Sequence, residues 1–264
     1  MLRLFSLSFV VLTALGARAQ QHSFTQVSTK DGLAQSQVRA MAQDAQGYLW
    51  FGTLGGASRF DGIEFTNYAL GDGLPDPQVS AMVRDPRGTL FLASGSQLAQ
   101  WTGNAFMTEL PPTSSNGARI AVLVADPRGR IHIGTDGGGL FLRDSTGIHP
   151  TPGFPSDTAS SIRSLLALKD GRLLIGLRNG LLLWENGECR SIPVGDEEPK
   201  AMNALAEGSD GSWWWARSWM GSIAFVPMEG RTNTMRRIAT CYGTTYAACW
   251  WMTAIISGSE PSSA

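Results

Sequence analysis

Hydrophobic and polar positions recur along this chain with a period of about 41 residues. In the first copy an apolar segment runs from Val38 to Asp44, a turn glycine follows, and a second apolar segment begins at Leu49. The turn glycines of five copies are 41, 41, 42 and 40 residues apart; they are Gly47, Gly88, Gly129, Gly171 and Gly211. A repeat of this length is typical of a protein built from stacked supersecondary units.

Each copy predicts four consecutive β-strands. The first, Val38 to Asp44, leads into an Asp-x-x-Gly turn, because aspartate accepts backbone hydrogen bonds and glycine takes the positive φ of a tight turn. The second, Leu49-Trp50-Phe51, is apolar at consecutive positions, which indicates that both of its faces are buried. The third includes Ser58-Arg59-Phe60, and the fourth, Phe65-Thr66-Asn67-Tyr68, is more polar.

Four strands in about 40 residues predict a propeller blade. We therefore expect an all-β fold, a β-propeller of about five recognisable four-stranded blades in residues 20–228. The number of copies leaves open whether the ring is complete. One position of the second strand is always small, which predicts that neighbouring chain segments approach closely there. This position is occupied by Gly52, Ala93, Gly134, Gly176 and Ala216.

The amino-terminal segment predicts how the ring closes. Phe24 to Val27, followed by Asp31-Gly32-Leu33, resembles Phe65 to Tyr68 followed by Asp72-Gly73-Leu74. We interpret it as a lone fourth strand whose first three strands come from the last copy, from about Met202 to Phe225. Such a closure would hide the sheet edges.

The first residues of the chain differ from the repeats. Residues 1–19 predict a signal peptide, because Arg3 precedes an apolar run from Leu4 to Leu15 and Ala17-Arg18-Ala19 fits the cleavage pattern. An uncleaved anchor is the alternative, although the run is short for a membrane span. We expect an exported chain, located in the periplasm or outside the cell.

The repeat pattern stops after Met228. Residues 229–264 predict a non-repeat tail, either a genuine extension or a segment read out of frame after a deletion or sequencing error. We favour the second explanation and expect little order there. The three cysteines show no metal-ligand spacing. We interpret Cys189 as a strand residue, and a Cys241–Cys249 disulfide stays open.

The net charge and the three histidines limit the classes of function that the sequence supports. A net charge of −1 gives no basis for a nucleic-acid partner. His22 lies near the start, His149 lies in a proline-rich connection, and His132 shares the repeat position of Trp50, which predicts packing between blades. These residues form no recognisable catalytic constellation. We therefore predict no catalytic residue, no metal site and no cofactor.

Two residue sets have a structural and a functional interpretation. We assign Asp44, Asp85, Asp126 and Asp170 to turns rather than to calcium binding. The aromatic residues Trp50, Phe91 and Trp214 favour packing between blades over a sugar-stacking platform. Side chains alternate along a strand, so at least one of the consecutive tryptophans 213–215 is expected to reach a surface. The ligand-binding residues are not identified by these patterns.

The repeat resembles a known family. Asp31-Gly32-Leu33, Val38 to Asp44, Gly47 to Thr53 and Gly56 to Gly62 look like the two-component regulator propeller repeat, and the resemblance covers about residues 22–226. The resemblance implies the extracytoplasmic sensor region of hybrid histidine kinases and related receptors, often for glycans. Members usually continue into an immunoglobulin-like domain, a membrane helix and a kinase or cyclase, which this sequence lacks, so the sequence resembles a truncated sensor.

We therefore predict a non-enzymatic ligand-sensing module that resembles the extracytoplasmic input domain of a two-component sensor. The resemblance implies that ligand binding shifts the geometry of a dimer. A homodimer and a ligand of unknown identity, with a glycan as the candidate, are the expected partners. Membrane attachment would come only through downstream domains. The alternatives are a secreted stand-alone binding protein and a propeller lyase.

Overall fold

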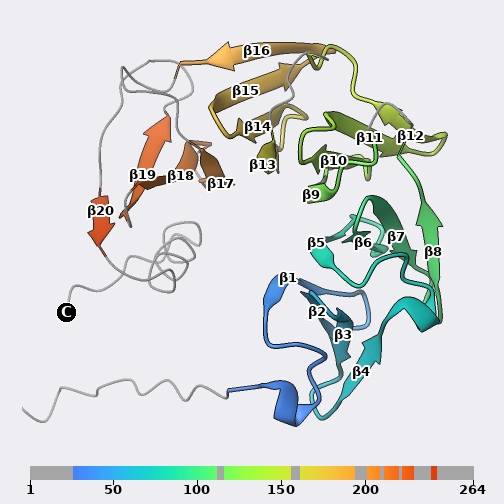
Figure 1. The fold of residues 1–264 in the computed structure, drawn as a ribbon. Helices are drawn as coiled ribbons and strands as arrows, with labels where there is room; N and C mark the ends of the chain where they lie inside the picture. The colour runs from blue at the N-terminus through green and yellow to red at the C-terminus, as the bar shows by residue number, and fades with distance from the viewer. Residues whose placement is uncertain are drawn as a thin grey trace, which may run out of the picture.

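The computed structural model describes residues 26–111, 116–155, 161–193, 201–208, 211–219, 222–228 and 239–242. These residues form five four-stranded antiparallel sheets, which follow one another along an arc with the first strand of each sheet on the inner side (Figure 1). The predicted all-β propeller of five blades is confirmed. The predicted signal peptide, residues 1–19, lies outside the described residues, as does most of the predicted tail.

Each blade contains four strands in chain order, and each strand pairs with the next. Blade one consists of β1 (Val38–Gln43), β2 (Leu49–Thr53), β3 (Gly56–Phe60) and β4 (Phe65–Tyr68). Blade two consists of β5 (Val79–Arg84), β6 (Leu90–Ser94), β7 (Gln97–Trp101) and β8 (Phe106–Glu109). Blade three consists of β9 (Ile120–Ala125), β10 (Ile131–Thr135), β11 (Leu140–Asp144) and β12 (Gly147–Pro150).

The last two blades follow the same order. Blade four consists of β13 (Ile162–Ala167), β14 (Leu173–Leu177), β15 (Gly180–Glu185) and β16 (Glu188–Ile192). Blade five consists of β17 (Met202–Glu207), β18 (Trp213–Trp219), β19 (Ser222–Met228) and β20 (Ala239–Tyr242). Two short 3₁₀ helices, η1 (Thr29–Asp31) and η2 (Leu70–Asp72), precede blades one and two.

The Asp-x-x-Gly turns join the first two strands of blades one to three. The Asp44 carboxylate accepts hydrogen bonds from the backbone N–H groups of Gln46 and Tyr48, at 3.0 and 2.9 Å. The Gly47 N–H donates to the Asp44 carbonyl at 3.2 Å, and Gly47 has the expected positive φ of 92°. Asp85 and Asp126 accept the same backbone hydrogen bonds.

The turn of blade four contains Asp170, as predicted, but differs from the other turns in one respect. Leu168, not Asp170, occupies the place of the turn aspartates, because the Gly171 N–H donates to the Leu168 carbonyl at 3.0 Å. Asp170 lies two residues later, where its carboxylate pairs with the Arg172 guanidinium at 2.6 Å. The spacing of glycines alone hides this difference.

Hydrophobic side chains fill the spaces between consecutive blades. Trp50 of β2 packs with Leu90 and Leu92 of β6, and Phe91 of β6 packs with Ile131 and Ile133 of β10 in the same way. Every residue of β6, β10 and β14 is buried. Their consecutive apolar sequences therefore reflect a blade on each side, as predicted.

The always-small position is where the innermost strand of the next blade comes closest. A Cβ atom added to Gly134 would lie 2.7 Å from Cγ2 of Ile162 in blade four and 2.7 Å from Cγ1 of Val122. A Cβ atom on Gly52 would lie 2.8 Å from Cγ1 of Val79 in blade two. Distances this short require a neighbour to move, so the predicted close approach is confirmed.

The ring is not closed, and the predicted closure is wrong. The fourth strand of the last sheet is β20, which pairs with β19, and not the amino-terminal segment. Gln26 and Val27 are not in a strand, and Phe24 and Thr25 lie outside the described residues. Among the described residues, blade one therefore has a neighbouring blade on one face only (Figure 1). Leu49 is 43% exposed there, whereas the equivalent Leu90 is 1% exposed.

Candidate ligand-binding site

The histidines of the described residues do not form a shared site. His132 lies in β10 and is buried between blades three and four, with its ring centroid 6.1 Å from that of Trp184, as expected. His149 belongs to the outer strand β12, where it pairs opposite Leu142, so its assignment to a connection was wrong. His149 is exposed, and one of its ring nitrogens lies 2.8 Å from Oγ1 of Thr146. His22 lies outside the described residues.

Trp50 and Phe91 of the aromatic repeat position pack the blades together as predicted, whereas Trp214 is only partly buried and the prediction is wrong for it. Trp50 and Phe91 are completely or almost completely buried, so neither can stack on a sugar. The Trp50 ring contacts the Trp101 and Phe106 rings of blade two, with centroid distances of 5.1 and 6.1 Å. Its indole N–H donates to a carboxylate oxygen of Asp44 at 2.8 Å.

The three consecutive tryptophans alternate, as expected for a strand. Trp213 and Trp215 are buried in the cluster shared with Leu174 and Leu183 of blade four. Trp214 lies between them in the strand and is only partly buried, with its indole N–H donating to Oγ of Ser212 at 2.9 Å. It is the one of the three that reaches a surface.

One buried carboxylate has a strongly shifted pKa. Burial alone would raise the pKa of Asp126, but the contacts with His132 and Arg130 outweigh it and hold the pKa well below its ordinary value. The Arg130 guanidinium is 2.6 Å from Oδ2 of Asp126, and Nε2 of His132 is 3.6 Å from the same oxygen. These groups lie inside the blade stack, so they serve its stability rather than a ligand.

Metal-ligating side chains are not gathered in the part of the chain that the structure describes. No three His, Cys, Asp or Glu residues come close enough there to hold a metal ion. Cys189 lies in β16, as predicted, and burial raises the pKa of its thiol to about 11. The proposed partner of Cys241, Cys249, lies outside the described residues.

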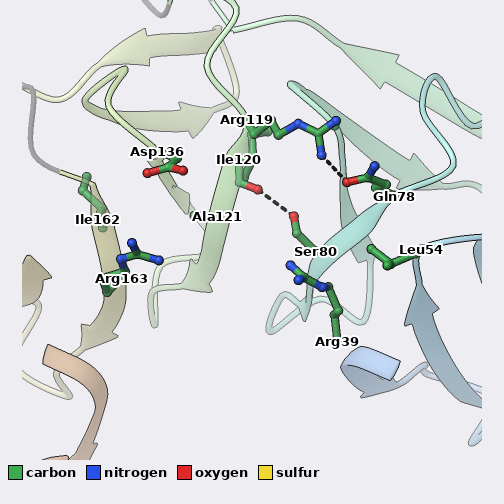
Figure 2. Close-up of a pocket in the computed structure, with 11 residues that line it drawn as sticks. Arg39, Leu54, Gln78, Ser80, Arg119, Ile120, Ala121, Asp136, Ile162 and Arg163 are labelled. Carbon is green, nitrogen blue, oxygen red and sulfur yellow. Dashed lines mark hydrogen bonds between the residues drawn. The ribbon is translucent and has the colours of Figure 1, made fainter. Parts of the chain in front are cut away.

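A cavity of about 380 Å³ opens where the innermost strands of blades one to four begin (Figure 2). Four blades contribute to it, through their first strands, the residues just before these strands, and the turns between their second and third strands. The lining residues are Arg39, Leu54, Gln78, Ser80, Gly95, Arg119, Ile120, Ala121, Asp136, Ile162 and Arg163. We call this cavity the inner-rim site.

The inner-rim site is built from equivalent repeat positions. The second residue of the innermost strand is Arg39 in β1, Ser80 in β5, Ala121 in β9 and Arg163 in β13. The residue before it is a buried hydrophobic that packs between blades in β5, β9 and β13. The pairing register shifts at the second residue in all four strands, so this residue lies outside the regular pairing with the second strand and lines the cavity. The residues that pack the blades therefore stay hydrophobic from repeat to repeat, whereas the residues that line the cavity differ.

Backbone hydrogen bonds fix the walls of the inner-rim site. The turn after β6 is tied to the start of β5, because the Gly95 N–H donates to the Gln78 carbonyl at 3.1 Å. The Asp136 N–H donates to the Arg119 carbonyl at 2.9 Å in the equivalent place of blade three. Between blades, the Ser80 hydroxyl donates to the Ile120 carbonyl at 2.6 Å (Figure 2). The lining is therefore held by hydrogen bonds within and between blades.

The charge of the inner-rim site is positive. Three arginines line it against a single aspartate, in a chain whose net charge is −1. Arg119 donates to the side chain of Gln78, and the Asp136 carboxylate accepts from the Ser161 hydroxyl. Arg39 and Arg163 have no hydrogen-bond or ion-pair partner within the described residues. Figure 2 shows both side chains extending toward the space between the blades.

Sequence reasoning did not identify these arginines. The signal was present in the repeat register, because residues 39, 80, 121 and 163 recur at the repeat spacing directly after a constant hydrophobic position. The sequence did not indicate which end of the innermost strands is hollow. That depends on how the blades are inclined to one another, which no single repeat encodes.

A second cavity, of about 430 Å³, lies at the other end of the innermost strands of blades one and two. It is lined by the turns after β1 and β5 and by the residues after β7. Only two blades contribute to it, and its charged side chains are Asp44, which holds its own turn, and Arg87. It therefore presents one cationic side chain, against three in the inner-rim site.

The chain is similar to known propellers. Two extracellular domains of hybrid two component systems from B. thetaiotaomicron match with TM-scores of 0.61 and 0.66, at 23% and 17% identity, over 74% and 83% of this chain. The matches span 27% and 32% of those domains, so this chain covers about a quarter to a third of their length. Virginiamycin B lyase from Staphylococcus aureus matches with a TM-score of 0.61 at 14% identity, over 80% of this chain and 71% of the lyase.

The sequence comparison points to one family. No curated protein matches the chain. In the described residues, no helix is long and apolar enough to cross a membrane. The family model of the two component regulator propeller matches residues 32–55, which include β1 and β2 and the turn between them. This chain is therefore a β-propeller whose first blade contains a segment, residues 32–55, that matches the two component regulator propeller model.

Proposed function

We propose that the chain is an exported, non-enzymatic recognition module of the kind used as the extracytoplasmic input of a two-component sensor, and that it binds a small ligand in the inner-rim site. One observation carries the proposal. Four blades place polar and cationic side chains around one cavity, while the blade-forming positions remain apolar. A cavity lined by a few convergent polar groups on a rigid scaffold is the usual form of a ligand site.

The fold comparisons support this role without defining the ligand. The extracellular domains of two-component systems share the blade architecture. The lyase shares it as well, at 14% identity. A hydrolytic or eliminating enzyme needs a general base beside its substrate. Neither His132, which is buried between blades, nor His149, on an outer strand, lines the inner-rim site. The one carboxylate of the lining, Asp136, accepts a hydrogen bond from the Ser161 hydroxyl. The site therefore favours binding over catalysis.

Binding at the inner-rim site can be tested with a blocking variant. Ala121 lies in the middle of the lining, so Ala121→Trp should fill the cavity and abolish ligand binding. The mature chain would be screened against mono- and oligosaccharides and organic acids by thermal shift, and hits measured by calorimetry. The matched control is Met107→Trp, since Met107 is exposed on β8, an outer strand.

We expect wild type and Met107→Trp to bind a hit equally and Ala121→Trp to lose it, with no conversion of the ligand in overnight incubations. Equal binding by Ala121→Trp, in a folded variant with the circular dichroism spectrum of wild type, would place the ligand elsewhere. Conversion of the ligand by wild type would favour the lyase alternative.

A further inference from the structure

We infer that the ligand of the inner-rim site is a dianion, with an oxyanion group near each end of a molecule that lies across the innermost strands of blades one to four. The inference rests on the proposed function, since it assigns a chemical class to the ligand of the same cavity. It starts from Arg39 and Arg163, which occupy the same repeat position in the first and the fourth of these blades.

In the part of the chain that the structure describes, three arginines outside the cavity have an ion-pair partner, unlike Arg39 and Arg163. Arg130 pairs with Asp126 at 2.6 Å, Arg143 with Glu109 at 2.9 Å, and Arg172 with Asp170 at 2.6 Å. Arg39 and Arg163 have no such partner among the described residues, although both are exposed toward the cavity. The guanidinium group is permanently charged and presents a planar fork of donors that fits carboxylate, sulfate or phosphate groups.

The residues between the arginines leave room for a ligand. Ser80 and Ala121 occupy the same repeat position in blades two and three, and both are small. The Ser80 hydroxyl donates to the Ile120 carbonyl, so it is held against the wall. The result is a row with a long cationic side chain at each end and small side chains in the middle, as Figure 2 shows. This row fits a molecule whose charges are at its ends.

The remaining charges of the site agree with an anionic ligand. Arg119 adds a third positive charge, and its guanidinium lies 4.0 Å from the Asp76 carboxylate and close to Gln78. The one acidic residue of the lining, Asp136, is hydrogen-bonded to Ser161. Since Arg119 faces the Asp76 carboxylate, the excess positive charge of the lining comes from Arg39 and Arg163 against Asp136, and the cavity attracts anions.

The inference is tested with two disaccharides that share a shape and differ in charge, and with two smaller anions. The full mature chain would be titrated by calorimetry with digalacturonate, with its neutral counterpart digalactose, with citrate and with inorganic phosphate. We expect digalacturonate or citrate to bind at least about tenfold more tightly than digalactose and phosphate, because only a molecule with two separated oxyanions reaches both arginines. If digalacturonate binds more tightly than citrate, the ligand belongs to the acidic sugars. If citrate binds more tightly, the ligand belongs to the organic acids.

Three charge variants separate the site from general electrostatics. Arg39→Gln and Arg163→Gln should each weaken binding of the dianion about tenfold or more, and Arg39→Lys should restore part of the loss because lysine keeps the charge without the fork. Arg128→Gln changes the net charge equally, but Arg128 is exposed on the β9–β10 turn outside the cavity, so binding should be unchanged.

The outcomes distinguish this inference from the proposed function. Suppose that a neutral sugar binds the wild type and both arginine variants equally but does not bind Ala121→Trp. This result would contradict a dianionic ligand and would still support the inner-rim site as the place of binding. Binding of the dianion that survives Ala121→Trp, or that Arg128→Gln weakens as much as Arg39→Gln does, would overturn the inference and place the anion outside this cavity.

Discussion

Single carboxylates in this protein hold a turn and a blade interface together. Asp44 accepts two backbone hydrogen bonds from its turn and one from the Trp50 indole, which packs against blade two. Asp126 accepts the same backbone bonds and in addition contacts Arg130 and His132. Because the side chain of Asp126 is buried, its charge is stable only while these partners are in place.

Asp126 should make the folding stability depend on pH. Its pKa is depressed in the folded state, since the contacts of His132 and Arg130 outweigh the effect of burial. A depressed carboxyl pKa contributes stability that is present above the ordinary pKa and is lost as the pH falls below it. We expect the free energy of unfolding of the wild type, from urea titrations, to decrease as the pH is lowered from about 5 to about 3.

Replacing Asp126 should remove this contribution. We expect Asp126→Asn to lower the free energy of unfolding by about 1–3 kcal/mol at pH 7 and to flatten its decrease in acid. Asp85→Asn is the matched control, because Asp85 holds the equivalent turn through backbone hydrogen bonds only and should lose less. An Asp126→Asn profile parallel to that of the wild type from pH 7 to 3 would show that Asp126 does not supply the pH dependence.

At the scale of strands, neighbouring blades come closest at one position of the second strand, and only a small residue fits there. Gly52, Gly134 and Gly176 each face the first strand of the following blade, and an added Cβ atom would contact Val79, Ile162 and Met202 respectively. Gly176 has an ordinary φ, as do the other two, so these glycines are required by space and not by backbone conformation. The spacing between blades therefore depends on the absence of a side chain.

A branched side chain in this position should disrupt the stack. We expect Gly134→Val to lower the free energy of unfolding by about 1–3 kcal/mol or more, through overpacking against Ile162 and Val122. Gly71→Val is the control, since Gly71 has open space around its Cα atom and an ordinary φ. Thermal and urea unfolding of both variants measure the difference, and a Gly134→Val variant as stable as Gly71→Val would disprove the close approach.

Strands were predictable from sequence where local patterns determine them. The consecutive apolar residues of β6 and β14 and the Asp-x-x-Gly turns identify the blades, because burial on both faces removes the alternation of polar and apolar residues. Pairing partners were less predictable. The similarity of Phe24–Val27 to β4 is local, whereas the choice between that segment and β20 is a long-range competition for one sheet edge. The inner-rim site depends on how four blades converge, so its arginines were not recognised.

At the scale of the whole molecule, the described blades form an arc in which one face of blade one has no neighbouring blade. In blade two, Leu90 and Leu92 are covered by the Trp50 side of blade one. The equivalent side chains of blade one begin with Leu49 in β2, and beside it Met41 of β1 is 70% exposed. The arc therefore has an apolar end at blade one, although the inner-rim site, built from blades one to four, is complete without a closed ring.

The exposed end predicts an unequal response to equal substitutions. Leu49 and Leu90 occupy the same repeat position, so their truncation to alanine removes the same atoms from the same strand position. Leu90→Ala should lower the free energy of unfolding by about 2–5 kcal/mol, because it leaves a cavity between blades one and two. Leu49→Ala should lower it by less than about 1 kcal/mol, because the side chain already contacts water.

The same pair of variants tests whether the arc stands alone in solution. A dimer that used the blade-one face would bury Leu49, and its truncation would then cost as much as that of Leu90 and make unfolding depend on protein concentration. Light scattering with size-exclusion chromatography gives the mass independently. A monomer with a small Leu49→Ala effect fits the open arc. An equal loss in both variants, in a particle of twice the chain mass, would mean that a second copy covers the blade-one face. The dimer contact at Leu49 would then be the one whose geometry a bound ligand changes.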